Sequence, residues 1–198
     1  TIWPLQQLRS VVEYSHQQKL KIHMDGARLW NAAVGSKTPE AEILKGFDSA
    51  SVCFSKGLGA PVGSALAGSK EFIQESRRFR KLFGGGMRQS GILAAAANYA
   101  LENHRERLAE DHENAQTLAF GLAEIPGTKL DPNDVETNII FFRLEEMDAY
   151  EFTEILCKNS ILVEAVEADL IRAVTNMMIG SSDIPNLLSV IQKVMSGD

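Results

Sequence analysis

Cysteine is scarce in this sequence of 198 residues, and long apolar runs are missing from it. The two cysteines, Cys53 and Cys157, lie far apart and in no metal-binding spacing. A secreted scaffold held together by disulfides would carry more of them, so we expect a reducing compartment. No run of about 18 uncharged apolar residues is present, which argues against a membrane-spanning helix.

Basic charge and a leader peptide are also missing. The 26 acidic residues outnumber the 20 Lys and Arg residues, and the net charge of −6 disfavours general binding to nucleic acid or anionic membranes. The hydrophobic share of 44% is too high for a disordered chain. The first residues form no charged or apolar leader and include no initiating Met. We therefore expect a cytoplasmic protein whose N-terminal part is absent, which leaves the mitochondrial matrix as an alternative.

Helix and strand patterns alternate through the first half of the sequence. Residues 4–18 and 28–34 predict helices, and short apolar stretches at 20–24, 50–54 and 63–67 predict strands. This order favours an α/β fold with a mostly parallel sheet and covering helices. A parallel sheet of three strands is thin, so we expect this unit to be the C-terminal part of a larger domain.

Longer helices dominate the middle of the chain, and a smaller mixed unit follows them. Pro126 and Gly127 end the last of these helices. We therefore divide the chain into a large-domain part with its connecting helix at 1–125 and a small α+β C-terminal domain at 126–198. The expected elements are helices over 72–83, 89–102 and 106–124, strands over 138–142, 161–163 and 171–174, and helices that begin at Asp148 and Asp183.

Two residues of opposite charge lie at the ends of predicted strands. Asp25 ends one strand, and Lys56 follows another by two residues. Ligands bind beyond the carboxyl ends of strands in an open α/β sheet, so neighbouring strands would bring both groups to one crevice. A lysine with a lowered pKa can act there as a nucleophile toward carbonyls. An ordinary ion pair is the simpler interpretation of these two residues taken alone.

The residues around Lys56 favour a ligand site over an ion pair. The segment 55–64 surrounds the lysine with three glycines, a proline and two serines. Glycines let the backbone approach a ligand closely, and small side chains leave room for it. Arg28 follows Asp25 by three residues, and both can point into the crevice if a helix begins there.

Three segments together resemble a known family. HMDGARLWNAAV at 23–34, CFSKGLGAPVGSALAGSKEFI at 53–73 and RKLFGGGMRQSG at 80–91 are similar to segments of the low-specificity L-threonine aldolases. These enzymes use pyridoxal 5'-phosphate and have the aspartate-aminotransferase-like fold, known as fold type I. The resemblance implies that residues 1–125 are the C-terminal part of the large cofactor-binding domain, followed by the small α+β domain.

The resemblance implies a role for each of five residues. Lys56 matches the lysine that holds the cofactor as a Schiff base, and Asp25 matches the carboxylate that pairs with the pyridine nitrogen. Arg28 matches a residue near the phenolic oxygen of the cofactor. Arg88 matches an arginine close to the cofactor or a substrate anion. Arg172 matches the arginine that grips the substrate carboxylate, for which a planar guanidinium is well suited.

The sequence departs from the family pattern in two ways. Asn176 stands where the family pattern leads us to expect a histidine. The family's cofactor-stacking histidine and glycine-rich phosphate turn belong to an N-terminal part that this sequence lacks. No metal is assigned, since His104 and His112 lie eight residues apart, too far for a helical pair of ligands.

The resemblance implies cleavage of L-threonine or L-allo-threonine to glycine and acetaldehyde. The same lysine and aspartate serve β-elimination, transamination or racemisation in related folds, and these stay open as alternatives. A non-catalytic, truncated remnant of the fold is a third interpretation. The resemblance also implies a homo-oligomer, a dimer or tetramer, with its active site at a subunit interface.

Overall fold

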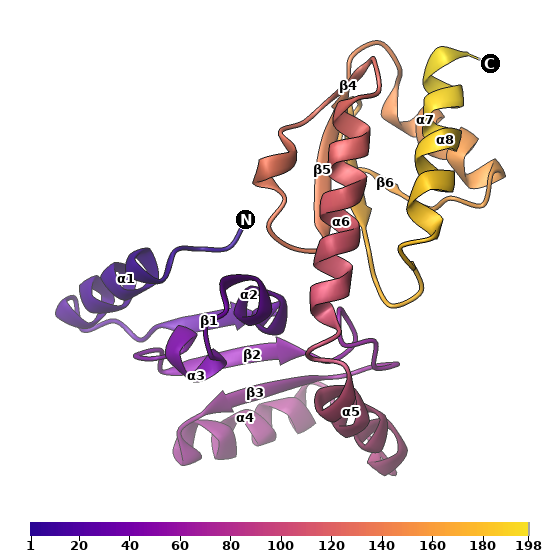
Figure 1. Cartoon of the computed structure of the whole chain (residues 1–198). Coiled ribbons are helices and arrows are strands. Elements are labelled where there is room, and N and C mark those ends of the chain that lie inside the picture. Colours follow the sequence, from indigo (N-terminus) through magenta and orange to yellow (C-terminus); the bar gives the residue numbers. More distant parts are fainter. Residues whose placement is uncertain (198) are drawn as a thin grey trace. The chain divides into compact units, whose positions relative to one another are not determined.

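The structure is a computed structural model that describes residues 1–197 (Figure 1). The chain divides into two units, one from Ile2 to Arg107 and the other beginning at Leu108. Each unit has its own sheet, of three strands in the first and four in the second. Within the described residues, no helix is long and apolar enough to cross a bilayer.

The first sheet has the order β1-β2-β3, with β1 at His23–Gly26, β2 at Ser49–Cys53 and β3 at Ser64–Gly68. β1 and β2 are parallel, and Asp25 lies opposite Ser51. The connection between them runs through two helices, α2 (Leu29–Ser36) and α3 (Glu40–Ile43), and a parallel pairing requires such a crossover.

The structure differs from the expected parallel sheet at the third strand, because β3 pairs with β2 in the antiparallel direction. The ten residues at 54–63 that join them form no helix. A parallel partner would need a crossover of about a dozen residues or more, and this loop instead reverses the chain directly. It is also the loop that carries Lys56.

Helices cover one face of this sheet. The helices α1 (Leu5–Gln17), α2 (Leu29–Ser36) and α3 (Glu40–Ile43) precede β2. Side chains alternate along a strand, so the apolar side chains of β1 and β2 point toward these helices and the polar ones point away. A small apolar cluster is formed by Leu29, Ala33 and Ile43, with Leu8, Met24, Ala32, Leu44 and Val52 packed against it.

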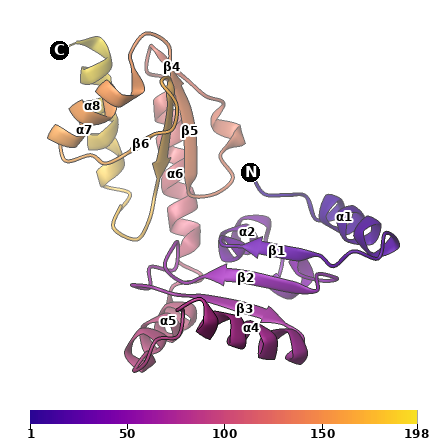
Figure 2. The ribbon, with the colours of Figure 1, turned by 180° about the vertical axis from the view of Figure 1, so that it is seen from behind.

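Two further helices follow β3. α4 (Lys70–Leu82) runs alongside β3 in both ribbon views (Figures 1 and 2). Ser69 caps it, since its Oγ accepts a hydrogen bond from the backbone N–H of Phe72 at 3.2 Å. None of its residues is buried. α5 (Gly91–Asn103) follows a glycine-rich segment and buries only Ala97 and Ala100.

The second unit packs three helices against an antiparallel sheet of order β4-β5-β7-β6. Alternate residues of β5 and β7 point into its core, where the rings of Phe142 and Phe152 meet edge to face at 6.1 Å. Its elements are α6 (Leu108–Ala123), β4 (Thr128–Lys129), η1 (Pro132–Asp134), β5 (Ile139–Leu144), α7 (Ala149–Lys158), β6 (Glu164–Ala165), β7 (Leu170–Val174) and α8 (Asp183–Ser196).

One strand of this unit differs from the expectation. The strand predicted over 161–163 is irregular, and β6 covers only Glu164 and Ala165. A tight reversal explains its short length, because the backbone N–H of Val166 already donates to the carbonyl of Leu170 at 2.8 Å. The chain therefore turns into β7 after only two paired residues.

Candidate active site

Lys56 lies in a loop whose backbone is closed by its own hydrogen bonds. At the base of the loop, the N–H of Phe54 donates to the carbonyl of Gly63 at 3.0 Å, and the N–H of Ala60 donates to Phe54 at 3.0 Å. At its tip, the N–H of Gly59 donates to the carbonyl of Lys56 at 2.8 Å and closes a turn. Gly59 has φ +70° and Gly63 has φ +119°, values at which glycine is favoured.

Two buried side chains anchor this turn in the first unit. Leu58 is only 1% exposed and Ala60 only 6%. The side chain of Lys56, which lies between β2 and these two buried residues in the sequence, is exposed. The ring of Phe54, just after β2, stacks on Trp30 of α2 with centroids 5.6 Å apart. The backbone of Lys56 is therefore fixed, and its amine is presented to solvent.

Asp25 lies near the carboxyl end of the neighbouring strand. Its Oδ1 accepts a hydrogen bond from the backbone N–H of Ala27 at 3.1 Å, which orients the carboxylate. The next residue, Gly26, is buried against β2, and a Cβ there would lie 2.7 Å from the carbonyl oxygen of Ser51. The adjacency of the two strands, on which the sequence argument depended, is confirmed. Asp25 and the Lys56 loop therefore share one edge of the sheet.

A histidine shares the face of Asp25. Nδ1 of His23 lies 2.8 Å from Oγ of Ser49, the residue opposite it on β2. His23 and Asp25 are two residues apart on one strand, so their side chains leave the same face. This face carries polar groups from both strands, whereas the other face carries the apolar cluster under the helices.

The two candidate site arginines of the first unit, Arg28 and Arg88, occupy different positions relative to the lysine. Arg28 is half-buried directly before α2, three residues after Asp25. Arg88 is exposed in the segment between α4 and α5. The 13 residues of α5 separate Arg88 from the end of the helix that contacts the Lys56 loop, and a helix of that length rises about 20 Å. Arg28 thus lies at the start of α2, three residues after Asp25, whereas Arg88 lies near the end of α5 opposite the one that contacts the Lys56 loop.

Arg172 belongs to the second unit and already has a carboxylate partner. Its Nη1 donates to Oε2 of Glu164 at 2.6 Å, and its side chain is 28% exposed. The two residues lie directly opposite each other on β7 and β6. A guanidinium carries five N–H donors, and the contact with Glu164 uses one of its nitrogens, Nη1.

Asn176, where the family pattern led us to expect a histidine, has a structural role. Its Oδ1 accepts a hydrogen bond from the backbone N–H of Met178 at 3.0 Å. Nδ2 of Asn114 holds the end of the same turn through the carbonyl of Ile179 at 3.0 Å. Asn176 therefore shapes the segment that follows β7.

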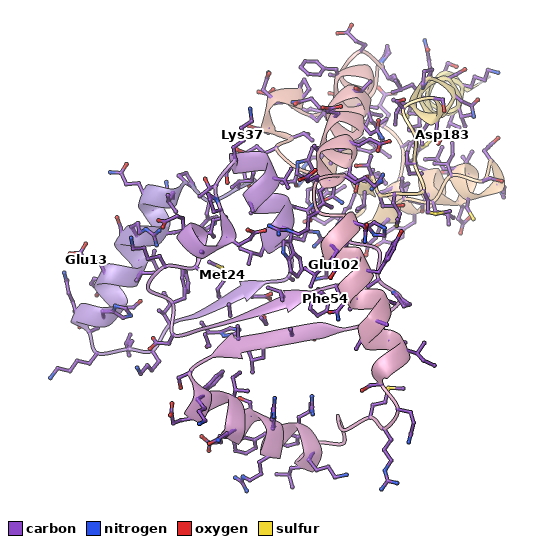
Figure 3. The ribbon with its side chains drawn as sticks, turned by 60° about the horizontal axis from the view of Figure 1, so that its bottom comes forward. Glu13, Met24, Lys37, Phe54, Glu102 and Asp183 are labelled. Carbon is purple, nitrogen blue, oxygen red and sulfur yellow. The ribbon has the colours of Figure 1, made fainter. Side chains whose placement is uncertain are left out.

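One contact of the site could not be predicted from the sequence. Nδ1 of His104, just after α5, lies 2.7 Å from the carbonyl oxygen of Leu58 in the lysine turn. Figure 3 labels Phe54, four residues before Leu58, and Glu102, two residues before His104. The partners are 46 residues apart, and no spacing rule links a histidine to a distant backbone carbonyl. Across residues 1–197, no group of three or more His, Cys, Asp or Glu side chains could hold a metal ion.

Solved structures share this fold. A structure from Listeria monocytogenes EGD-E matches with a TM-score of 0.81 and 26% identity over 98% of this chain and 57% of its own. A threonine aldolase from Leishmania major matches with a TM-score of 0.77 and 19% identity over 98% of this chain and 57% of its own. The fold, with Lys56 and Asp25 at one sheet edge, defines part of a fold type I α/β protein. Within that class, the chain belongs to the beta-eliminating lyase family, whose model matches residues 1–145.

Curated relatives confirm the resemblance to low-specificity L-threonine aldolases. Low-specificity L-threonine aldolase 1 of Arabidopsis thaliana is 41% identical over 188 residues, which are 93% of this chain and 52% of that protein. The low specificity L-threonine aldolase of Escherichia coli (strain K12) is 41% identical over 176 residues, which are 89% of this chain and 51% of that protein. The chain spans about half the length of the curated relatives it matches.

Proposed function

We propose that this chain is part of a pyridoxal 5'-phosphate-dependent lyase that cleaves L-threonine or L-allo-threonine to glycine and acetaldehyde. The observation that carries the proposal is the exposed amine of Lys56 on a fixed turn, at the same sheet edge as the Asp25 carboxylate. The relatives from Arabidopsis thaliana and Escherichia coli, which are named threonine aldolases, support the choice of substrate.

The residues of the first unit fit this cofactor. Lys56 offers a primary amine that can condense with an aldehyde, and its closed turn fixes the backbone from which the amine extends. Asp25 offers a carboxylate that can keep a proton on a pyridine nitrogen, oriented by the N–H of Ala27. Arg28 offers a cation three residues away, suited to a phenolate oxygen. When bound, the cofactor supplies an electron sink for the charge left on Cα as the Cα–Cβ bond breaks.

In this proposal, Arg172 binds the carboxylate of the substrate. A guanidinium binds a carboxylate through two parallel hydrogen bonds, which fixes orientation better than an ammonium group does. Glu164 holds one edge of Arg172 and leaves the other for the substrate. Asn176 and Met178 shape the segment just beyond this arginine.

We also infer that the chain works as a homo-oligomer, a dimer or tetramer with its active site at a subunit interface. The segment around Arg88 is unusually apolar for a surface, and apolar surface of this kind marks interaction sites. Its exposed apolar residues are Leu82, Phe83, Met87 and Ile92, which are 67–84% exposed. The reducing environment expected from the sequence fits two free cysteines, so we infer the cytoplasm or the mitochondrial matrix.

Release of aldehyde tests this proposal. The protein with pyridoxal phosphate is given threonine, phenylserine, serine and alanine in separate reactions. We expect acetaldehyde and glycine from threonine, and no turnover when Lys56 is replaced by alanine. The matched control is Lys70→Ala at the start of α4, which should keep its activity. Near-normal turnover by the Lys56→Ala variant would contradict the assignment.

A further inference from the structure

A histidine outside the proposed catalytic set is bonded to the lysine turn. The carbonyl oxygen of Leu58 can only accept a hydrogen bond, so Nδ1 of His104, 2.7 Å away, carries the hydrogen. The Tyr99 ring meets the imidazole edge to face, with centroids 5.5 Å apart. The N–H of His104 donates to the carbonyl of Ala100 at 2.9 Å, which fixes the backbone of the histidine to α5.

Leu58 is therefore held at two points. Its side chain is 1% exposed and anchors the turn in the core. Its carbonyl is anchored to the end of α5 through His104. Leu58 lies inside the turn that Gly59 closes onto the carbonyl of Lys56, so any movement of Leu58 also moves the backbone of Lys56.

We propose that His104 is a positioning residue for Lys56. It acts through the Leu58 carbonyl and fixes the turn from which the lysine amine reaches its aldehyde partner. This inference rests on the proposed function, because it assigns the Lys56 amine to bond formation with the cofactor. A preorganised backbone leaves only the lysine side chain to be ordered when that bond forms, and this raises the rate of reaction.

Two substitutions separate this role from general support of the fold. His104→Leu removes the donor and keeps a side chain of similar size. His104→Asn is the matched control, since its amide nitrogen occupies the place of Nδ1 and can donate to the same carbonyl. A neutral hydrogen bond contributes a factor of about three to ten to an equilibrium, which sets the size of the expected effects.

Two measurements are made on the full chain and both variants. Hydrogen exchange followed by mass spectrometry reports on the turn, through the amides of Gly59 and Ala60. Borohydride trapping with pyridoxal phosphate, followed by peptide mapping, reports the rate of adduct formation at Lys56. We expect His104→Leu to speed exchange and slow adduct formation, each by about three- to tenfold, and His104→Asn to restore both.

Each other outcome has a definite meaning. Unchanged exchange in His104→Leu would show that the bond does not hold the turn, and this overturns the inference. Faster exchange with an unchanged trapping rate would make His104 a structural support alone, and this also overturns it. If no adduct forms at Lys56 in the unsubstituted chain, the proposed function itself is contradicted, and so is the positioning role that depends on it.

Discussion

Glu164 and Arg172 face each other across β6 and β7, and Oε2 of Glu164 lies 2.6 Å from Nη1 of Arg172. In this contact, the arginine proposed to bind the substrate carboxylate already donates a hydrogen bond to a carboxylate oxygen of the protein. Cross-strand pairs of opposite charge restrict each other's conformations. Glu164 therefore keeps Arg172 on the open face of its sheet instead of letting it move freely in solvent.

Arg172→Lys should weaken substrate binding far more than an equivalent change elsewhere on the sheet. Lysine keeps the charge and loses the planar fork, so we expect the KM for threonine to rise about 10- to 100-fold, as for the loss of a charged hydrogen bond. The control is Arg143→Lys, whose arginine pairs with Asp169 at 2.6 Å on the same sheet. Equal KM values for both variants in steady-state assays would argue against a carboxylate site at Arg172.

Asp25→Asn should reduce turnover without unfolding the site. Asparagine keeps the oxygen that accepts from the N–H of Ala27, so the loop should keep its shape. It loses the negative charge that can hold a proton on the pyridine nitrogen, and we expect kcat to fall about 100-fold or more. The measurement is kcat beside an unfolding curve. Full activity in this variant would remove Asp25 from the proposed chemistry.

Gly26→Ala should force the two strands of the site apart. The new Cβ would lie 2.7 Å from the backbone oxygen of Ser51, which cannot move away as a flexible side chain could. We expect a loss of about 1–3 kcal/mol in the free energy of unfolding, as for other overpacked positions. Gly91→Ala at the start of α5 is the control, since nothing lies within 4 Å of its Cβ. Urea denaturation of both variants makes the comparison, and similar midpoints would contradict the close packing of β1 on β2.

Asp48→Asn should change how stability depends on pH. A hydrogen bond from Lys21, and then one from the backbone N–H of Ile22, lower the pKa of Asp48 below its usual range. A group whose pKa is lower in the folded state binds its proton more readily when unfolded. Its contribution is therefore present above about pH 4 and is lost as the pH falls through the lower, folded-state pKa.

The test of Asp48 is a series of urea unfolding curves between neutral and acid pH. Asp48→Asn should lower the midpoint at neutral pH and flatten its decline in acid. Glu75→Gln, at an exposed position of α4, is the control and should leave the profile unchanged. A variant profile parallel to that of the unsubstituted protein would show that Asp48 gives no pH-dependent stability.

Local sequence signals predicted much of the fold. The helix predicted from Asp183 is α8, and Asp148 caps α7 by accepting from the N–H groups of Tyr150 and Glu151. Both signals act over a few residues, so a single sequence contains them. The sequence also predicted that Asp25 and Lys56 lie at the same edge of the sheet, because parallel neighbouring strands have their carboxyl ends on the same side.

Contacts that depend on distant residues were beyond the sequence. The direction of β3 depends on how its loop closes, and this loop closes through the bond from Phe54 to Gly63. The contact of His104 with Leu58 joins a helix end to a backbone carbonyl that every residue possesses. No residue type marks such a carbonyl in advance, so only the folded arrangement identifies it.

The most direct test of the central claim is to map where pyridoxal phosphate attaches. The chain is incubated with a low concentration of the cofactor, reduced with borohydride, digested and analysed by mass spectrometry. We predict a single pyridoxyl adduct at Lys56, whose amine is exposed on a closed turn beside Asp25. Labelling scattered over Lys37, Lys45 and Lys70, or no adduct at Lys56, would contradict a cofactor site at this lysine.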